Sequence, residues 1–172
     1  VESKVTLGEK GRVLLELPDK IQKIQRRAYQ RQPIPNELNV KVLFWHRGYL
    51  DTVRINPVDH YWQGQLADLS AGGLRVLIEM DKKDCFTIGQ VVGLQFTPMY
   101  YQKPILAEGH LRYLTEDEDN QVLSLGIEFL GLEVSVEGRQ ILQRLLDTVQ
   151  EYERLNSETG ASTASVEPAP SI

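Results

Sequence analysis

Cysteine is almost absent from this chain of 172 residues, in which Cys85 is the only one. A single cysteine cannot form an internal disulfide, and this usage fits a reducing, cytoplasmic compartment. The chain has no run of 18 or more apolar residues, so the sequence predicts no transmembrane helix and no membrane insertion. It also lacks the pattern of a secretory signal, and because it begins with Val rather than Met we expect a fragment of a longer protein.

An excess of positive charge is lacking as well, since the formal net charge is -5 and the pI is about 5.3. Proteins that bind duplex nucleic acid gain affinity by neutralising many phosphates, so this balance argues against broad nucleic-acid binding. The three histidines, His46, His60 and His110, are scattered and have no metal-ligand spacing to cysteine or carboxylates. The sequence therefore predicts no metal site and no metal-dependent enzyme.

Alternation of apolar and polar residues dominates the middle of the chain. Leu38, Val40, Val42 and Phe44 fall on one face of such a segment, and turn-forming residues separate it from similar segments. Six strands at this spacing predict a mainly β fold, a small antiparallel barrel that is closed or split. The predicted strands are 38–45, 61–67, 73–80, 90–97, 104–114 and 121–130.

One helix follows the predicted strands. Ser135 is a suitable N-cap, and apolar residues from Ile141 to Tyr152 recur at helical spacing, which indicates packing on the core. The remaining residues are small and polar, so we expect disorder there. The chain thus divides into the end of a preceding domain or a stray strand (1–20), an arginine-rich lead-in (21–35), a barrel (36–132), a C-terminal helix (133–155) and a tail (156–172).

The lead-in concentrates positive charge in an acidic chain. Arg26, Arg27 and Arg31 fall within the six residues RRAYQR, and Pro33 and Pro35 after them favour extended backbone. In an extended segment Arg27 and Arg31 point to the same side, about 13 Å apart at ~3.3 Å per residue. Guanidinium groups can then bind phosphate oxygens in pairs or read the O6 and N7 edge of guanine. A solvated basic connector would have the same composition.

The segment DLSAGG, residues 68–73, lies between two predicted strands. Asp68 and Ser70 offer a carboxylate and a hydroxyl, and Gly72 and Gly73 permit positive φ and a close approach of the backbone to a ligand. An ordinary hairpin turn has a similar composition. With the arginines, however, the segment suits a guanine nucleotide, because a carboxylate can accept hydrogen bonds from N1–H and N2–H of guanine while arginines bind the phosphates.

These two segments resemble the motifs of the PilZ domain family, bacterial receptors for cyclic di-GMP. RAYQR, residues 27–31, is similar to the RxxxR motif, and DLSAGG is similar to the (D/N)xSxxG motif. The run LGIEFLGL, residues 125–132, resembles the last barrel strand of the family, and the whole resemblance covers residues 24–150. It implies a six-stranded PilZ barrel with a C-terminal helix.

The resemblance also implies the ligand and the roles of single residues. Arg27 and Arg31 would clamp phosphate and guanine. In the family, an arginine directly before the motif, as Arg26 is here, accompanies the binding of an intercalated pair of ligands. Simple charge complementarity is the alternative interpretation of Arg26. Asp68 and Ser70 would bind guanine and phosphate. The implied site for cyclic di-GMP comprises Arg26, Arg27, Arg31, Asp68, Ser70, Gly72 and Gly73.

Residues 12–31 resemble the last strand and connector of flagellar brake proteins, in which a separate N-terminal barrel precedes the PilZ domain. This implies a receptor without catalytic activity, whose lead-in orders on ligand binding and alters the interaction with a protein partner. We expect the partner to be a component of the flagellar motor, and this protein to be recruited to the flagellar basal body. Three alternatives stay open: a single-stranded nucleic-acid-binding barrel using Trp45 and Trp62, a split-barrel flavin enzyme, and a ligand-free interaction domain.

Overall fold

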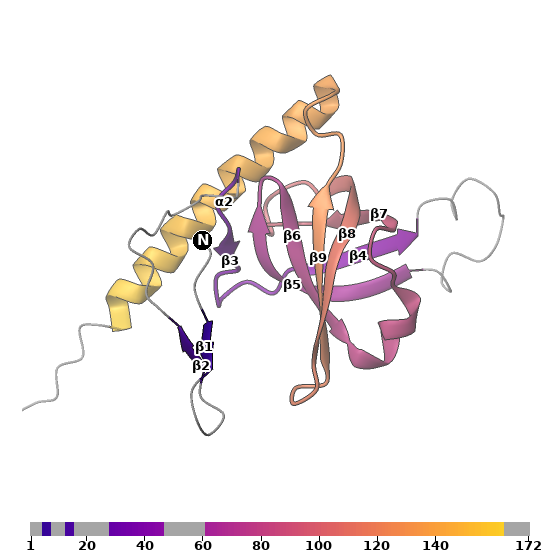
Figure 1. Ribbon diagram of the computed structural model, residues 1–172. Helices are drawn as coiled ribbons and strands as arrows, with labels where there is room; N and C mark the ends of the chain where they lie inside the picture. Colours follow the sequence, from indigo (N-terminus) through magenta and orange to yellow (C-terminus); the bar gives the residue numbers. More distant parts are fainter. Residues whose placement is uncertain (1–4, 8–12, 16–27, 47–60, 164–172) are drawn as a thin grey trace, which may run out of the picture.

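The computed structural model describes residues 5–7, 13–15, 28–46 and 61–163. Figure 1 shows a β-barrel with one long helix lying across it. The strands are β1 (Val5–Leu7), β2 (Val13–Leu15), β3 (Gln32–Pro33), β4 (Lys41–His46), β5 (Tyr61–Ser70), β6 (Gly73–Glu79), β7 (Val91–Phe96), β8 (Ile105–Asp117) and β9 (Val122–Phe129). The helices are the 3-10 helix η2 (Met80–Cys85) and the α-helix α2 (Val136–Thr163). No helix among the described residues is both long and apolar enough to cross a membrane.

The barrel is closed by six antiparallel strands. Their order is β5-β4-β7-β8-β9-β6, and β6 pairs with β5 to complete the circle. This confirms the predicted mainly β fold with a six-stranded barrel and a C-terminal helix. Each of the six predicted strands overlaps one observed strand. β1 and β2 form a separate antiparallel pair.

The alternation read from the sequence determines which side chains fill the barrel. Val42 and Phe44 of β4 are completely buried, whereas Leu43 between them is 40% exposed. On β9 every second side chain, from Leu123 to Phe129, points into the same core. Because side chains alternate between the faces of a strand, the residues between these core positions lie on the outer surface of the barrel.

The end of the lead-in is a strand, which the sequence pattern did not predict. Gln32 and Pro33 form β3 and pair with Leu69 and Asp68 at the end of β5. The Ile34 amide donates to the Ala67 carbonyl at 3.1 Å. Strand β4 pairs with β5 only as far as Gln65, so the last residues of β5 are available for β3. Proline is tolerated at such an edge because its missing N–H is not needed.

Helix α2 begins as predicted and ends later than predicted. The Gly138 amide donates to Ser135 Oγ at 2.9 Å, which confirms the N-cap, and Leu145, Val149 and Tyr152 are buried against the barrel. The helix continues to Thr163 rather than stopping at residue 155. The hydroxyls of Ser157 and Thr159 donate to carbonyls four residues earlier. These polar side chains are therefore compatible with the helix and do not end it.

Candidate functional site

Two rows of residues on the outer face of the barrel contain three of the predicted site residues, Asp68, Ser70 and Gly73. In the first, the serine row, strand pairing places Ser70, Gly73, Glu128 and His110 side by side across β5, β6, β9 and β8. In the second, the aspartate row, it places Pro33, Asp68, Arg75, Gly126 and Tyr113 side by side across β3, β5, β6, β9 and β8. Leu69 and Leu74, which separate the two rows along β5 and β6, point into the core. The two rows are therefore adjacent on the outer face of the barrel.

The serine row begins at the turn between β5 and β6. Ser70 pairs with Gly73, leaving a two-residue loop, and the buried Ser70 Oγ donates to the Gly73 carbonyl at 3.0 Å. A Cβ on Gly73 would lie 2.3 Å from the Ile127 carbonyl oxygen, and one on Gly72 would lie 2.9 Å from the Tyr29 ring. Neither glycine has positive φ. The close approach of the Ile127 backbone is what favours glycine at position 73.

Asp68 carries an ion pair in the aspartate row. Its Oδ2 lies 2.5 Å from Nε of Arg75, and the Asp68 side chain is only 15% exposed whereas that of Arg75 is 39% exposed. The other carboxylate oxygen, Oδ1, is buried and has no hydrogen-bond partner among the described residues. A buried acceptor without a partner costs free energy, so Oδ1 is suited to accept a hydrogen bond from a ligand.

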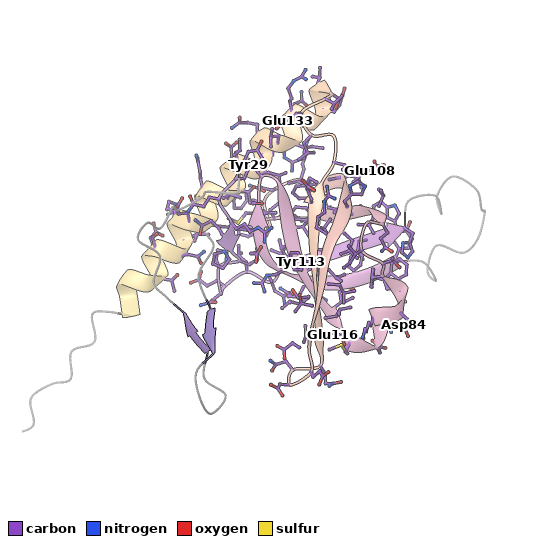
Figure 2. All side chains as sticks on the ribbon, in the orientation of Figure 1. Tyr29, Asp84, Glu108, Tyr113, Glu116 and Glu133 are labelled. Carbon is purple, nitrogen blue, oxygen red and sulfur yellow. The ribbon has the colours of Figure 1, made fainter. Side chains whose placement is uncertain are left out.

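Several contacts attach the described part of the lead-in to the rest of the protein. The Tyr29 hydroxyl donates to Glu133 Oε1 at 3.0 Å, and Gln30 Nε2 donates to Glu153 Oε1 at 3.4 Å. Asn156 Nδ2 of α2 donates to the Pro33 carbonyl at 3.0 Å. The hydrogen bond to Glu133 raises the pKa of Tyr29, with smaller contributions from burial and from the charge of the carboxylate. Figure 2 shows Tyr29 and Glu133 together beside α2.

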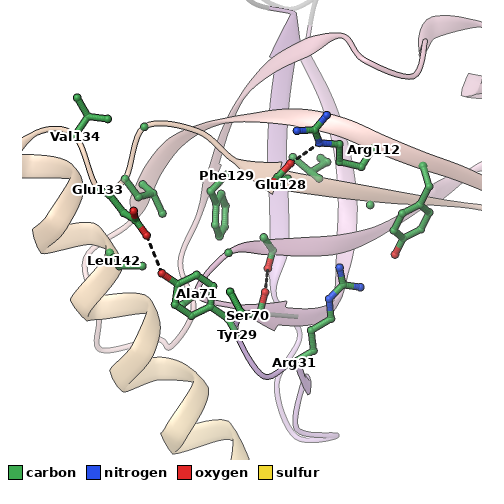
Figure 3. A pocket seen from close by; sticks show the side chains of 18 residues that line it. Tyr29, Arg31, Ser70, Ala71, Arg112, Glu128, Phe129, Glu133, Val134 and Leu142 are labelled. Atoms are coloured by element: carbon green, nitrogen blue, oxygen red, sulfur yellow. Dashed lines mark hydrogen bonds and ion pairs between the residues drawn. The ribbon is translucent and has the colours of Figure 1, made fainter. Parts of the chain in front are cut away.

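A pocket of about 550 Å³ lies where the lead-in, the turn, β9 and the start of α2 meet. Arg31 extends along one side of Ser70, and Tyr29 lies on the other side, towards α2 (Figure 3). Arg112 pairs with Glu128 on the opposite wall. The Tyr113 ring lies so closely over Gly126 that a Cβ there would overlap it. The pocket thus offers a guanidinium, a hydroxyl, a backbone turn and an aromatic ring to one ligand.

The structure brings together most of the residues predicted from the two motifs. Arg31, Ser70, Gly72 and Gly73 line the pocket. Asp68 lies in the adjacent row, two residues before Ser70 on β5. Arg26 and Arg27 lie outside the described residues.

The residues that surround the motifs in space were not predicted from the sequence. They are Tyr29, Arg75, Arg112, Tyr113, Gly126, Glu128 and Glu133. For Arg75 a signal existed, because a two-residue hairpin loop after Ser70 necessarily puts it opposite Asp68. Neither Trp45 nor Trp62 lines this pocket; Trp45 covers Gly93 and Trp62 stacks on Phe44.

The chemistry of the pocket suits an anionic ligand with hydrogen-bond donors on a planar base. Arg31 can bind phosphate oxygens, and Tyr113 can contact the face of a ring. Asp68 Oδ1 can accept from a base. Among the described residues, no three histidine, cysteine or carboxylate side chains are grouped as metal ligands would be.

Fold and pocket together define a small antiparallel barrel with a candidate ligand pocket beside residues 28–31 and the turn between β5 and β6. A sequence model of the PilZ domain matches residues 25–148, and the chain belongs to the PilZ domain family. A comparison with curated proteins gave no match.

Solved structures share this fold at low sequence identity. The Bacillus subtilis inhibitor of motility MotI is 19% identical with a TM-score of 0.61, and the match covers 91% of this chain and 66% of MotI. The PilZ domain of Escherichia coli YcgR, solved with c-di-GMP, is 21% identical with a TM-score of 0.55, covering 78% of this chain and 98% of that domain. The K. pneumonia MrkH–c-di-GMP complex is 15% identical with a TM-score of 0.54, covering 88% and 66%. The chain therefore spans about two thirds of MotI and MrkH.

Proposed function

We propose that this chain is a cytoplasmic receptor for cyclic di-GMP and has no catalytic activity of its own. The observation that carries the proposal is the meeting of Arg31 with Ser70 and Gly73 in one pocket, because these residues come from two motifs far apart in the sequence. Membership of the PilZ family supports it, as do structural relatives that were solved in complex with c-di-GMP.

Each proposed contact follows from the chemistry of the residue. Arg31, with Arg27, binds phosphate and the Hoogsteen edge of guanine. Ser70 and the turn glycines contact phosphate, and Asp68 accepts from the Watson–Crick edge of guanine. The role of Arg27, and that of Arg26 in binding an intercalated pair of ligands, is proposed from the sequence alone.

The proposed output is a change in the lead-in that alters contact with a protein partner. Ligand phosphates would attract the arginines of residues 26–31 to the pocket and fix the chain segment before it. Residues 30–33 contact both the barrel and α2, so a ligand that fixes them would also act on residue 27 and the residues before it. Control of flagellar motility, by recruitment to the flagellar basal body, is the process we propose, in line with the inhibition of motility for which MotI is named.

Isothermal titration calorimetry with cyclic di-GMP tests the proposal directly. Wild-type protein should bind with micromolar or tighter affinity, and Arg27→Ala, Arg31→Ala and Asp68→Ala should each weaken binding at least about tenfold, because each removes a charge-assisted hydrogen bond. Arg154→Ala is the matched control, since Arg154 pairs with Glu151 and Glu158 on α2 outside the pocket.

GTP and a short single-stranded oligonucleotide serve as ligand controls in the same titrations. Binding of an oligonucleotide with steep salt dependence, and no binding of cyclic di-GMP, would replace the receptor with a nucleic-acid-binding barrel. The measured stoichiometry decides the role of Arg26: two ligands per chain, falling to one in Arg26→Ala, indicates an intercalated pair.

A further inference from the structure

Arg75 lies outside both sequence motifs, yet it is the residue that binds the carboxylate of Asp68. The pairing is built into the hairpin, because Asp68 and Arg75 are direct cross-strand neighbours on β5 and β6. Cross-strand neighbours hold their side chains within contact distance, so the pair does not depend on a mobile loop. On its other side Arg75 is followed in the aspartate row by Gly126, which Tyr113 covers.

The two oxygens of Asp68 have different surroundings. Arg75 Nε binds Oδ2, while Oδ1 is buried without a partner among the described residues. A carboxylate oxygen can accept two hydrogen bonds, so Oδ2 can accept from a ligand as well as from Arg75. With one oxygen fixed, the plane of the carboxylate is restricted and Oδ1 is held in one direction. Guanine presents two adjacent donors, N1–H and the 2-amino group, to such a carboxylate.

We propose that Arg75 is a positioning residue that fixes the Asp68 carboxylate for recognition of the guanine edge, and so determines the preference of the site for guanine over other bases. The inference rests on the proposed function. Arg75 acts through Asp68 and does not itself contact the ligand. Because the Asp68 carboxylate is already oriented in the folded protein, less conformational entropy is lost when the ligand binds. This increases the affinity for guanine and the discrimination against other bases.

The test compares two ligands and two backgrounds. Cyclic di-IMP is the probe, because its hypoxanthine bases keep N1–H and O6 of guanine but lack the 2-amino group. Calorimetry is carried out with cyclic di-GMP and cyclic di-IMP on wild type, Arg75→Gln, Asp68→Asn and the double variant. Thermal unfolding of each variant shows that it is folded, and Lys83→Gln serves as the matched control, since it breaks the ion pair from η2 to Glu116 of β8, and neither residue of that pair lines the pocket.

We expect Arg75→Gln to weaken cyclic di-GMP binding about tenfold and to reduce the preference for cyclic di-GMP over cyclic di-IMP by several fold. In the Asp68→Asn background, replacing Arg75 should change the affinity by less than about twofold, because the group through which it acts has been altered. Lys83→Gln should leave both affinities and the preference between the two ligands unchanged.

Three results would overturn the inference while leaving the receptor intact. Equal weakening for both ligands that persists in Asp68→Asn would mean that Arg75 binds phosphate directly. Tighter binding by Arg75→Gln would mean that Arg75 competes with the ligand for Asp68. Affinities unchanged by Arg75→Gln would show that Asp68 needs no support. If folded wild-type protein binds no cyclic di-GMP, the proposed function itself fails and this inference fails with it.

Discussion

Gly73 joins the turn motif to the packing of the barrel, and this gives a prediction for a single residue. In Gly73→Ala the new Cβ would lie 2.3 Å from the Ile127 carbonyl oxygen, a backbone atom that cannot rotate away. We expect a loss of about 1–3 kcal/mol in the free energy of unfolding. This exceeds the ~0.4–1 kcal/mol that alanine gains by restricting the unfolded chain. Urea denaturation followed by circular dichroism measures the difference.

Gly72→Ala is the matched control for that prediction. Its new Cβ would meet the ring of Tyr29 at 2.9 Å, and a side chain can turn where a backbone carbonyl cannot. We expect Gly72→Ala to cost less than about 1 kcal/mol of stability. If both variants lose the same stability, close approach of β6 to β9 is not the reason for glycine at position 73.

Local sequence patterns predicted some of the residues that line the candidate pocket, and long-range strand pairing placed the others there. Arg31, Ser70 and Gly73 could be predicted because their motifs are short and continuous. Arg75 opposite Asp68 was also within reach of the sequence, since it follows from the loop length. Tyr113 over Gly126 was not, because that contact depends on the pairing of β8 with β9 and on an irregularity in register between Leu111 and Tyr113. Local sequence contains no signal for such a register.

The same distinction holds for strands and helices. The six barrel strands could be predicted because each has enough residues to show a period of two. β3 has two residues and no period, and it exists because β5 extends beyond its pairing with β4. The end of α2 was misjudged for another reason: Arg154 pairs with Glu151 and Glu158 along the helix, and such pairs support a helix without any apolar stripe.

Tyr152 gives a prediction for the attachment of α2 to the barrel. Its hydroxyl donates to the Pro98 carbonyl at 2.8 Å, and burial, with a smaller effect of Tyr101, raises the pKa of Tyr152 well above its ordinary value. A group whose pKa is higher in the folded state contributes stability below its unfolded pKa near 10 and loses it as pH rises further. We therefore expect the free energy of unfolding to fall above about pH 10, by up to ~1.4 kcal/mol per pH unit.

Tyr152→Phe separates this effect from other alkaline titrations. At neutral pH it should cost about 0.5–1.5 kcal/mol through the lost hydrogen bond. Above about pH 10 the difference from wild type should shrink, because phenylalanine has no proton to lose. Tyr100→Phe, which alters a ring that is 91% exposed, is the control and should parallel wild type. A constant difference between Tyr152→Phe and wild type from pH 7 to 11 would contradict the assignment.

For the whole molecule, the arrangement of contacts links the pocket to α2. Residues 28–33 lie between the turn on one side and the C-terminal region on the other. Tyr29 bonds to Glu133 in the segment just before α2, and Gln30 and Pro33 bond to Glu153 and Asn156 of α2. A ligand that binds Arg31 would stabilise this segment, and the segment would in turn stabilise the helix positions that it contacts. The helix could then transmit the bound state to a partner that does not contact the ligand.

Hydrogen exchange with and without cyclic di-GMP tests this link. Saturating ligand should slow exchange in residues 28–35 and near Glu133 and Glu153 by at least about fivefold, which corresponds to roughly 1 kcal/mol of local stabilisation. Strand β7 contributes no residue to the pocket, and its exchange should not change. In Tyr29→Phe the protection near Glu133 should be lost while that of the turn at residues 70–73 and that near Glu153 remain, because only the hydrogen bond to the segment before α2 has been removed. Protection that stops at the turn in the wild type would mean that α2 is a passive support, and any signal to a partner would then have to leave through the lead-in alone.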